Sequence, residues 1–352
     1  MAAQRLSGAK LLLLALPVLA IVLVSGCTTG NTASGTGVVV KEFAPEFSEI
    51  YSREPVNFRL LLKNEGSVEA KNVHAELLGL DEDWCALGAT SCQPSEGGRQ
   101  ERLPNENECK YIQGGGFNML APDPQRGTSG SSHICTWTYT APPIQKGFTI
   151  TYTPTVRVFY TYSSGVIKLI TFGSSSELRT IQDTAGKLPA ETKSQTSSTI
   201  MLDIQTKGPI RFWQGENKVV FPLEITITNV GGGVACAITG SGNIETMKDA
   251  CKTTKSGEEP KNKVRLIIDF GEARGDIMKI SDECKDFMGY GKTISLWKGQ
   301  SNSVVCEVEA SSLSSGATIQ RMVQATAIYE YYTDTDSSIK VIGRETEDKS
   351  FF

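Results

Sequence analysis

The sequence predicts a mainly β protein that contains two tandem immunoglobulin-like β-sandwich domains. Three observations support this prediction: strand-like runs in which β-branched or aromatic residues alternate with polar ones, an internal repeat, and four cysteines in each half of the chain. We expect a disulfide-pinned insertion in each domain and a short helix in the second insertion. The expected domains cover residues 38–181 and 199–343.

The first 26 residues have the layout of a secretory signal peptide. Their apolar run, Leu11 to Val24, would form a helix of roughly 21 Å, which is short for a spanning segment of about 20 residues. The run ends in Val24-Ser25-Gly26-Cys27, which resembles the lipobox of bacterial and archaeal lipoproteins. The resemblance implies that Cys27 becomes the lipidated N-terminus of the mature chain. The alternative is an ordinary signal peptide that is cleaved near Gly26.

Residues 27–37 form the expected tether, because Thr, Gly, Asn, Ala and Ser make up the ten positions after Cys27. No later segment is apolar and long enough to span a membrane. We therefore expect an exported protein that faces outward and is attached to the cell membrane through a lipid on Cys27.

The charge of the expected mature chain argues against a nucleic-acid partner. The whole chain has 35 Lys plus Arg and 39 Asp plus Glu, and two of the basic residues lie in the first 26 positions. The remaining 326 residues are therefore acidic overall, and their number suits two domains better than one.

The nine cysteines comprise Cys27 and two sets of four. Exported chains meet oxidising conditions, so each set is interpreted as two disulfides. The simplest pairing is Cys109 with Cys135, Cys85 with Cys92, Cys284 with Cys306, and Cys236 with Cys251. The sequence alone leaves three connectivities open in each domain. A zinc site usually has a close cysteine pair and histidines, whereas the closest cysteines here are seven apart, so no metal site and no cofactor is predicted.

The internal repeat consists of a strand, an Asn-x-Gly turn and a second strand. Phe58–Val73 can be laid over Leu223–Ile238, which places Asn64 on Asn229 at an offset of 165 residues. The later matches are Cys135 with Cys306, at an offset of 171, and Tyr160-Thr-Tyr162 with Tyr329-Glu-Tyr331, at 169. Offsets that drift so little predict two copies of one domain. Residues 182–198 have linker composition, and residues 344–352 form a short C-terminal tail.

The predicted elements follow from residue patterns. The strands are 56–62, 149–162, 166–172, 223–228, 325–332 and 339–342, and polar turns at 163–165 and 333–338 suggest a long hairpin in each copy. The insertions are Asp81–His133 and Gly240–Val305. In the second insertion, the apolar positions of residues 276–288 lie on one helical face: Ile277, Ile280, Cys284, Phe287 and Met288.

The repeated strand, Asn-x-Gly, strand unit resembles the CARDB-type adhesion modules and related immunoglobulin-like domains of archaeal and bacterial surface proteins. The resemblance covers about forty residues of each copy. It implies a surface-exposed binding or scaffolding role and identifies no catalytic residues.

The motifs point to a protein that is not an enzyme, because the chain has neither a G-x-S-x-G elbow nor an H-E-x-x-H motif. The aromatic residues of the insertions are expected to pack beneath the disulfides, and the alternative is a ligand-facing platform. They are Trp84, Tyr111, Phe117, Tyr290 and Trp297.

The predicted function is a non-enzymatic binding or scaffolding role in the cell envelope, with envelope proteins or polysaccharide as partners. One alternative is a subunit of a surface filament or surface layer that assembles by strand pairing. A second alternative is an enzyme that acts on envelope polysaccharide through paired carboxylates.

Overall fold

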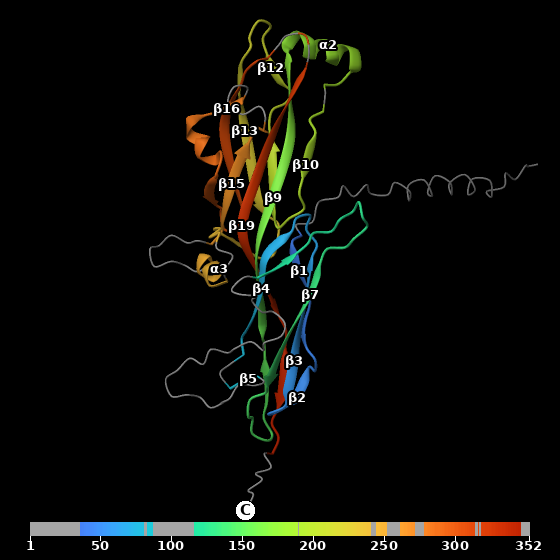
Figure 1. Cartoon of the computed structure of the whole chain (residues 1–352), viewed down its shortest axis with the longest axis vertical. Helices are drawn as coiled ribbons and strands as arrows, with labels where there is room; N and C mark the ends of the chain where they lie inside the picture. The colour runs from blue at the N-terminus through green and yellow to red at the C-terminus, as the bar shows by residue number, and fades with distance from the viewer. Residues whose placement is uncertain are drawn as a thin grey trace, which may run out of the picture. The chain divides into compact units, whose positions relative to one another are not determined.

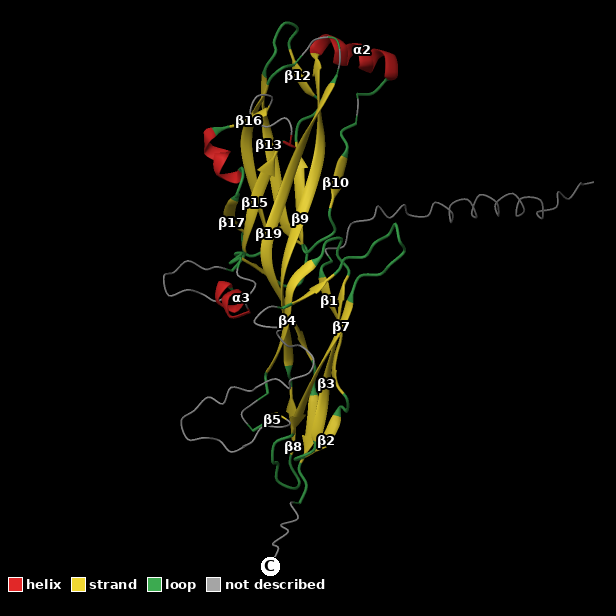
Figure 2. Cartoon of the chain, in the orientation of Figure 1, coloured by secondary structure: helices red, strands yellow, loops and turns green. Residues whose placement is uncertain are grey.

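The structure is a computed structural model that describes residues 36–80, 83–86, 116–188, 190–240, 244–251, 261–271, 278–313, 316 and 318–345. Within these ranges the protein is mainly β, with several sheets and a few short helices (Figure 2). Cys27 and the expected signal peptide, most of the tether, and residues 346–352 lie outside the described residues.

The first half of the chain forms a four-stranded sheet whose order is β1, β3, β7, β5. Its strands are β1 (Val38–Pro45), β3 (Pro55–Asn64), β5 (Cys85–Ala86) and β7 (Ser132–Thr140). Alternation along β3 explains why it forms a strand that is buried on one face: Val56, Phe58, Leu60 and Leu62 are buried, and Arg59 between them is exposed.

The second half forms a four-stranded sheet with the order β11, β13, β18, β16. Its strands are β11 (Ile200–Gln205), β13 (Val219–Asn229), β16 (Met278–Ile280) and β18 (Ser301–Ala310). β13 repeats the pattern of β3, because Phe221, Leu223, Ile225 and Ile227 are buried at alternate positions.

Both halves contribute to one nine-stranded sheet. Its main order is β17, β15, β19, β9, β4, β6; β10 and β12 also pair with β9, and β14 with β19. The strands are β4 (Ala70–Leu78), β6 (Phe117–Met119), β9 (Thr155–Ser174), β10 (Lys193–Gln195), β12 (Ile210–Phe212), β14 (Val234–Cys236), β15 (Lys263–Asp269), β17 (Lys292–Ser295) and β19 (Ile319–Asp336). β9 and β19 lie side by side and pair without interruption from Thr155 with Asp336 to Phe172 with Ile319 (Figure 1).

The two expected hairpins are absent from these described strands. Residues 163–165 continue β9 instead of turning, because Ser163, Ser164 and Gly165 are paired with β19 residues 326–328. In the second half, β19 extends to Asp336, and β20 (Ile339–Ile342) does not pair with it. β20 pairs instead with two strands of the first half, β2 (Glu49–Tyr51) and β8 (Thr149–Tyr152). Both predictions relied on local turn composition, and long-range strand pairing overrides it.

The segment expected to act as a linker, 182–198, is held against the large sheet. Helix α2 (Ser175–Ala185) begins at Ser174, whose hydroxyl accepts a hydrogen bond from the Glu177 N–H, and ends at Gly186 in the left-handed conformation. β10 then pairs with β9 from Lys193 to Gln195. Glu191, which lies between α2 and β10 in the sequence, forms an ion pair with Lys168 at 2.9 Å.

The second insertion contains helical segments, although not a single helix over 276–288. Helix α3 covers Ile244–Ala250, and the 3-10 helix η2 covers Asp282–Phe287. Residues 278–280 form strand β16, because Met278 and Ile280 pair with Ala310 and Val308 of β18. Cys284 and Phe287 are buried, as the apolar pattern of this segment predicted.

Strand pairing also corrects one match of the repeat. Cys135 lies opposite Leu60, and Val304 lies opposite Ile225. Since Leu60 and Ile225 are equivalent at the offset of 165, the counterpart of Cys135 is Val304 and not Cys306. The offset from β7 to β18 is therefore 169 (135 to 304), which equals the offset between the tyrosine motifs of β9 and β19.

Candidate functional site

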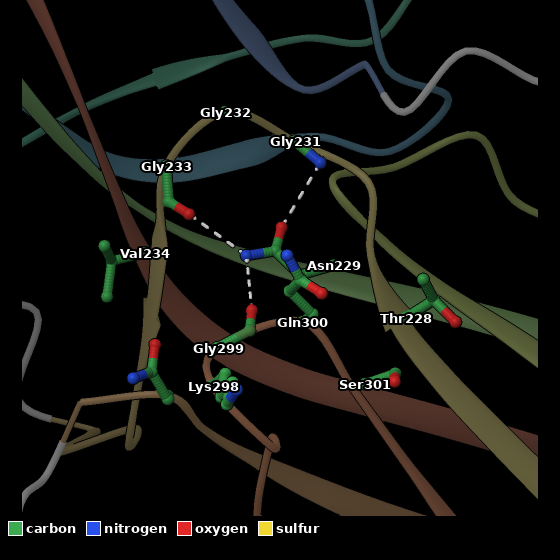
Figure 3. Close-up of a pocket in the computed structure, with 11 residues that line it drawn as sticks. Thr228, Asn229, Gly231, Gly232, Gly233, Val234, Lys298, Gly299, Gln300 and Ser301 are labelled. Carbon is green, nitrogen blue, oxygen red and sulfur yellow. Dashed lines mark hydrogen bonds between the residues drawn. The ribbon is translucent and has the colours of Figure 1, made fainter.

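A polar pocket of about 430 Å³ lies between two turns of the second half (Figure 3). One turn follows β13, and the other connects Trp297 to Ser301. The lining residues are Thr228, Asn229, Gly231, Gly232, Gly233, Val234, Asn262, Lys298, Gly299, Gln300 and Ser301. Lys298 is the only charged residue among the described residues of this lining, and the others are neutral.

The side chain of Asn229 holds the two turns together. Its Nδ2 donates to the carbonyl oxygens of Gly233 and Gly299 at 3.0 and 3.1 Å, as Figure 3 shows. Its Oδ1 accepts hydrogen bonds from the Gly231 N–H at 3.2 Å and from the Tyr331 hydroxyl at 3.0 Å. The amide therefore has no spare donor, and Asn229 shapes the pocket rather than contacting a ligand through its Nδ2.

Asn64 makes the corresponding hydrogen bonds in the first half. Its Nδ2 donates to the carbonyl oxygens of Val68 and Met119, and its Oδ1 accepts from the Gly66 N–H. The pattern that suggested the repeat is therefore a structural device that closes a turn. The polar side chains of the lining that remain to contact a ligand are those of Thr228, Asn262, Lys298, Gln300 and Ser301.

The second turn presents Trp297 to solvent. Lys298 and Gly299 both have positive φ values, of 49° and 74°, and the Gln300 N–H donates to the Trp297 carbonyl at 2.9 Å. This geometry is a type I′ turn, which favours glycine at its second central position. Trp297 remains 74% exposed on a backbone that is held by hydrogen bonds at both ends of the turn.

The other aromatic residues of the insertions have different surroundings. Trp84 is 2% exposed and packs edge-on against Phe58, so it belongs to the core. Phe117 is half-buried and stacks on His133 with their ring centroids 4.0 Å apart. Tyr290 is 95% exposed, and Tyr111 lies outside the described residues. The main expectation, that these residues pack in the core, is therefore confirmed for Trp84 and wrong for Tyr290 and Trp297, which are exposed.

Disulfides are present in both halves. Cys236 is bonded to Cys251 and Cys284 to Cys306, which are the two pairs expected for the second half. In the first half, Cys85 and Cys135 each take part in a disulfide. Their expected partners, Cys92 and Cys109, lie outside the described residues. Disulfides in both halves of the chain indicate an oxidising, extracellular environment.

Four buried tyrosines lie where the two halves meet: Tyr160, Tyr162, Tyr329 and Tyr331. Burial raises the pKa of Tyr162 and of Tyr331 to about 12, and it raises the pKa values of Tyr160 and Tyr329 further. The hydroxyls of Tyr162 and Tyr331 accept hydrogen bonds from the N–H groups of Val68 and Gly233, which favours the phenolate but does not outweigh desolvation.

We expect the protein to lose stability as the pH rises above about 10. An unfolded tyrosine ionises near pH 10, whereas these buried tyrosines remain neutral to higher pH, so the unfolded state is favoured progressively above pH 10. Thermal unfolding between pH 8 and 11.5 should show a constant midpoint up to about pH 10 and a falling one beyond it. Absorbance at 295 nm should show that the four buried tyrosines ionise only on unfolding. Normal titration of all ten tyrosines in the folded protein would contradict this prediction.

Glu330 lies between Tyr329 and Tyr331 on β19, and its buried side chain is on the opposite face of the sheet. It is 1% exposed, and its Oε1 accepts hydrogen bonds from the backbone N–H and the hydroxyl of Thr239 at 3.0 and 2.7 Å. Desolvation raises its pKa. Its Oε2 has no hydrogen-bond partner among the described residues. The two tyrosine motifs differ at their central residue, which is Thr161 in the first and Glu330 in the second. This difference is the feature of the sequence that points to the Glu330 carboxyl.

Sequence reasoning did not identify the pocket residues Asn262, Lys298 and Gln300. The only local signal was the Lys298-Gly299 pair after Trp297, which is typical of a tight turn. Asn262 directly precedes β15 and has a positive φ of 59°. The pattern of residues along the chain does not predict that it lies in the pocket. Among the described residues, no helix is both long and apolar enough to cross a membrane.

Comparisons with known proteins identify no family for this chain. No family model and no curated protein sequence matches it. One similar solved structure is that of the Enterococcus faecalis MSCRAMM ACE, a protein that binds its ligands by the collagen Hug model. It is 7% identical, over 87% of this chain and 95% of that chain, at a TM-score of 0.16. A TM-score this low does not indicate a shared fold.

Proposed function

We propose that this protein is a lipid-anchored surface protein with two immunoglobulin-like halves and a non-enzymatic role in binding envelope polysaccharide. The observation that carries the proposal is the turn at Trp297. It presents an exposed aromatic ring and supplies Lys298, Gly299, Gln300 and Ser301 to a polar pocket. Aromatic faces stack on sugar rings, and amide, hydroxyl and amino groups satisfy sugar hydroxyls and carboxylates.

The size and rigidity of the site support this proposal. A pocket of about 430 Å³ is within the range of small-ligand sites and suits one or two sugar units of a longer chain. The Asn229 hydrogen bonds hold both turns, so a ligand meets a preformed surface and little entropy is lost on binding.

The anchor rests on the N-terminal sequence and on the disulfides. The Val24-Ser25-Gly26-Cys27 segment supports lipidation of Cys27, and the disulfides support export. Intact mass of protein purified from membranes tests this part. The expected result is loss of residues 1–26, a lipid-sized mass increase, and eight thiols that appear only after reduction. An unlipidated chain, or thiols that react without reduction, would contradict the anchor.

We expect Trp297→Ala to lower the affinity for envelope polysaccharide by about tenfold, since an aromatic contact contributes about 0.5–1.5 kcal/mol beyond its buried area and about 1.4 kcal/mol corresponds to a factor of ten. Affinity electrophoresis or calorimetry with purified envelope polysaccharide measures the change. Trp213→Ala is the matched control, because Trp213 is 71% exposed on a turn that supplies no residue to the pocket, whereas Trp297 directly precedes the lining residue Lys298. Equal loss with both variants, or binding that is unchanged by Trp297→Ala, would contradict the polysaccharide site.

A second candidate function is assembly by strand pairing, and strand β8 favours it. β8 pairs only with β20 among the described strands. Its own Ile150 is 44% exposed, and Phe148, which directly precedes it, is 63% exposed. An apolar edge strand can pair with another chain. Sedimentation over a range of concentrations distinguishes the two candidates. Polymers that disappear in Ile150→Lys would support assembly, and a monomer at every concentration would contradict it.

A further inference from the structure

The pairing of β9 with β19 is nearly symmetric. Tyr160 lies opposite Tyr331, and Tyr162 lies opposite Tyr329. At the offset of 169, Tyr329 is the counterpart of Tyr160 and Tyr331 is the counterpart of Tyr162. Tyr160 therefore faces the counterpart of Tyr162, and Tyr162 faces the counterpart of Tyr160. Thr161, which lies between them, faces its own counterpart, Glu330. This reciprocal register is the mark of an isologous contact, in which a twofold axis passes between the two central residues.

The hydrogen bonds around the tyrosines repeat in the same way. The Tyr162 hydroxyl accepts from the Val68 N–H at 3.2 Å, and the Tyr331 hydroxyl accepts from the Gly233 N–H at 2.8 Å. Val68 and Gly233 are counterparts at the offset of 165. The nearby glycines, Gly66 and Gly231, are also counterparts, and an added Cβ would lie 2.0 Å from the Tyr162 hydroxyl and 2.4 Å from the Tyr331 hydroxyl.

We propose that an approximate twofold axis between Thr161 and Glu330 relates the two halves, and that Glu330 prevents the second half from pairing with the second half of another molecule. In such a pair, Glu330 would lie opposite Glu330 of the other copy. In the native chain it lies opposite Thr161, which carries no charge. The carboxyl thus directs the second half to the first half.

The proposal follows from the position of the charge. Residues directly opposite each other in antiparallel strands have Cβ atoms about 4.5–5.5 Å apart, and like charges at this distance are destabilising. Burial increases the penalty, because Glu330 is 1% exposed and water would screen a second carboxylate opposite it only weakly. A repulsive contact of this kind selects one partner by excluding another. It also gives a role to a buried carboxyl whose Oε2 lacks a partner among the described residues.

The excluded contact can be reproduced within one chain by placing a glutamate at position 161. We expect Thr161→Glu to lower the thermal unfolding midpoint at pH 8 by about 5 °C relative to Thr161→Gln, which has the same size and no charge. In the Glu330→Gln background the difference between the two substitutions should disappear. If Thr161→Glu is as stable as Thr161→Gln beside the native Glu330, the carboxylates do not repel each other and the proposal is wrong.

A second experiment measures pairing between molecules. The disulfide-intact protein is unfolded in guanidinium, refolded at high concentration, and analysed by light scattering after size exclusion. Glu330→Gln keeps an oxygen for the Thr239 hydrogen bonds and removes the charge, so we expect its dimer fraction to rise several-fold. Glu307→Gln removes an exposed charge of β18 and should behave as the native chain does. Equal dimer fractions for Glu330→Gln and the native chain would overturn the proposal.

Discussion

Replacing Asn64 with alanine is expected to lower the free energy of unfolding by about 3–5 kcal/mol. The side chain is fully buried, and its amide bonds the carbonyl oxygens of Val68 and Met119 at 2.8 and 2.9 Å and the Gly66 N–H at 3.1 Å. The alanine variant leaves three backbone groups without this partner, and each unmade bond costs about 1–3 kcal/mol. Guanidinium unfolding measures the change, with an unchanged slope if only stability is affected.

The control for Asn64→Ala is Asn57→Ala, which removes one exposed hydrogen bond to Glu46 and one from Thr138. This control should cost about 1 kcal/mol. Asn229→Ala should resemble Asn64→Ala, because Asn229 makes the same bonds and accepts one more from Tyr331. A loss below about 1 kcal/mol at either position would show that the turn does not depend on the amide.

Removing the Cys284–Cys306 disulfide is expected to cost about 3 kcal/mol, because the bond closes a loop of 22 residues in the unfolded chain. The double variant Cys284→Ala with Cys306→Ala should lower the midpoint of thermal unfolding by about 6–12 °C. The bond joins η2 to β18, so η2 should also become more susceptible to proteolysis.

The Cys236–Cys251 disulfide provides a comparison for this prediction. It closes a shorter loop of 15 residues and joins β14 to the end of α3, and its removal should cost about as much in the chain-entropy model. A midpoint that does not change when Cys284 and Cys306 are replaced would show that packing alone holds η2, and the prediction would then be wrong.

The β-rich character of the fold could be predicted from the sequence because it depends on local alternation. β3 and β13 bury every second residue, and this period is visible along the chain. The disulfides of the second half could be predicted because the oxidising compartment favours pairing and the nearest cysteines form the shortest loops.

Features that depend on distant strands could not be predicted from local pattern. Ser163-Ser164-Gly165 has the composition of a turn, but its pairing with β19 keeps it extended. β20 follows β19 in sequence and yet pairs with β2 and β8, which lie about 190–290 residues earlier in the chain. The pocket shares this limit, because Asn262 and Gln300 are distant in the sequence and line the same pocket only in the folded chain.

The uninterrupted pairing of β9 with β19 has a mechanical consequence. The two strands are hydrogen-bonded over 18 residue pairs, from Thr155 with Asp336 to Phe172 with Ile319, and they contribute to the core of both halves. Reorienting one half against the other would require many of these backbone bonds to break together, in contrast to domains that are joined by a flexible connection. Load applied at one half is therefore transmitted to the other through the sheet itself, so the molecule resists bending at its centre.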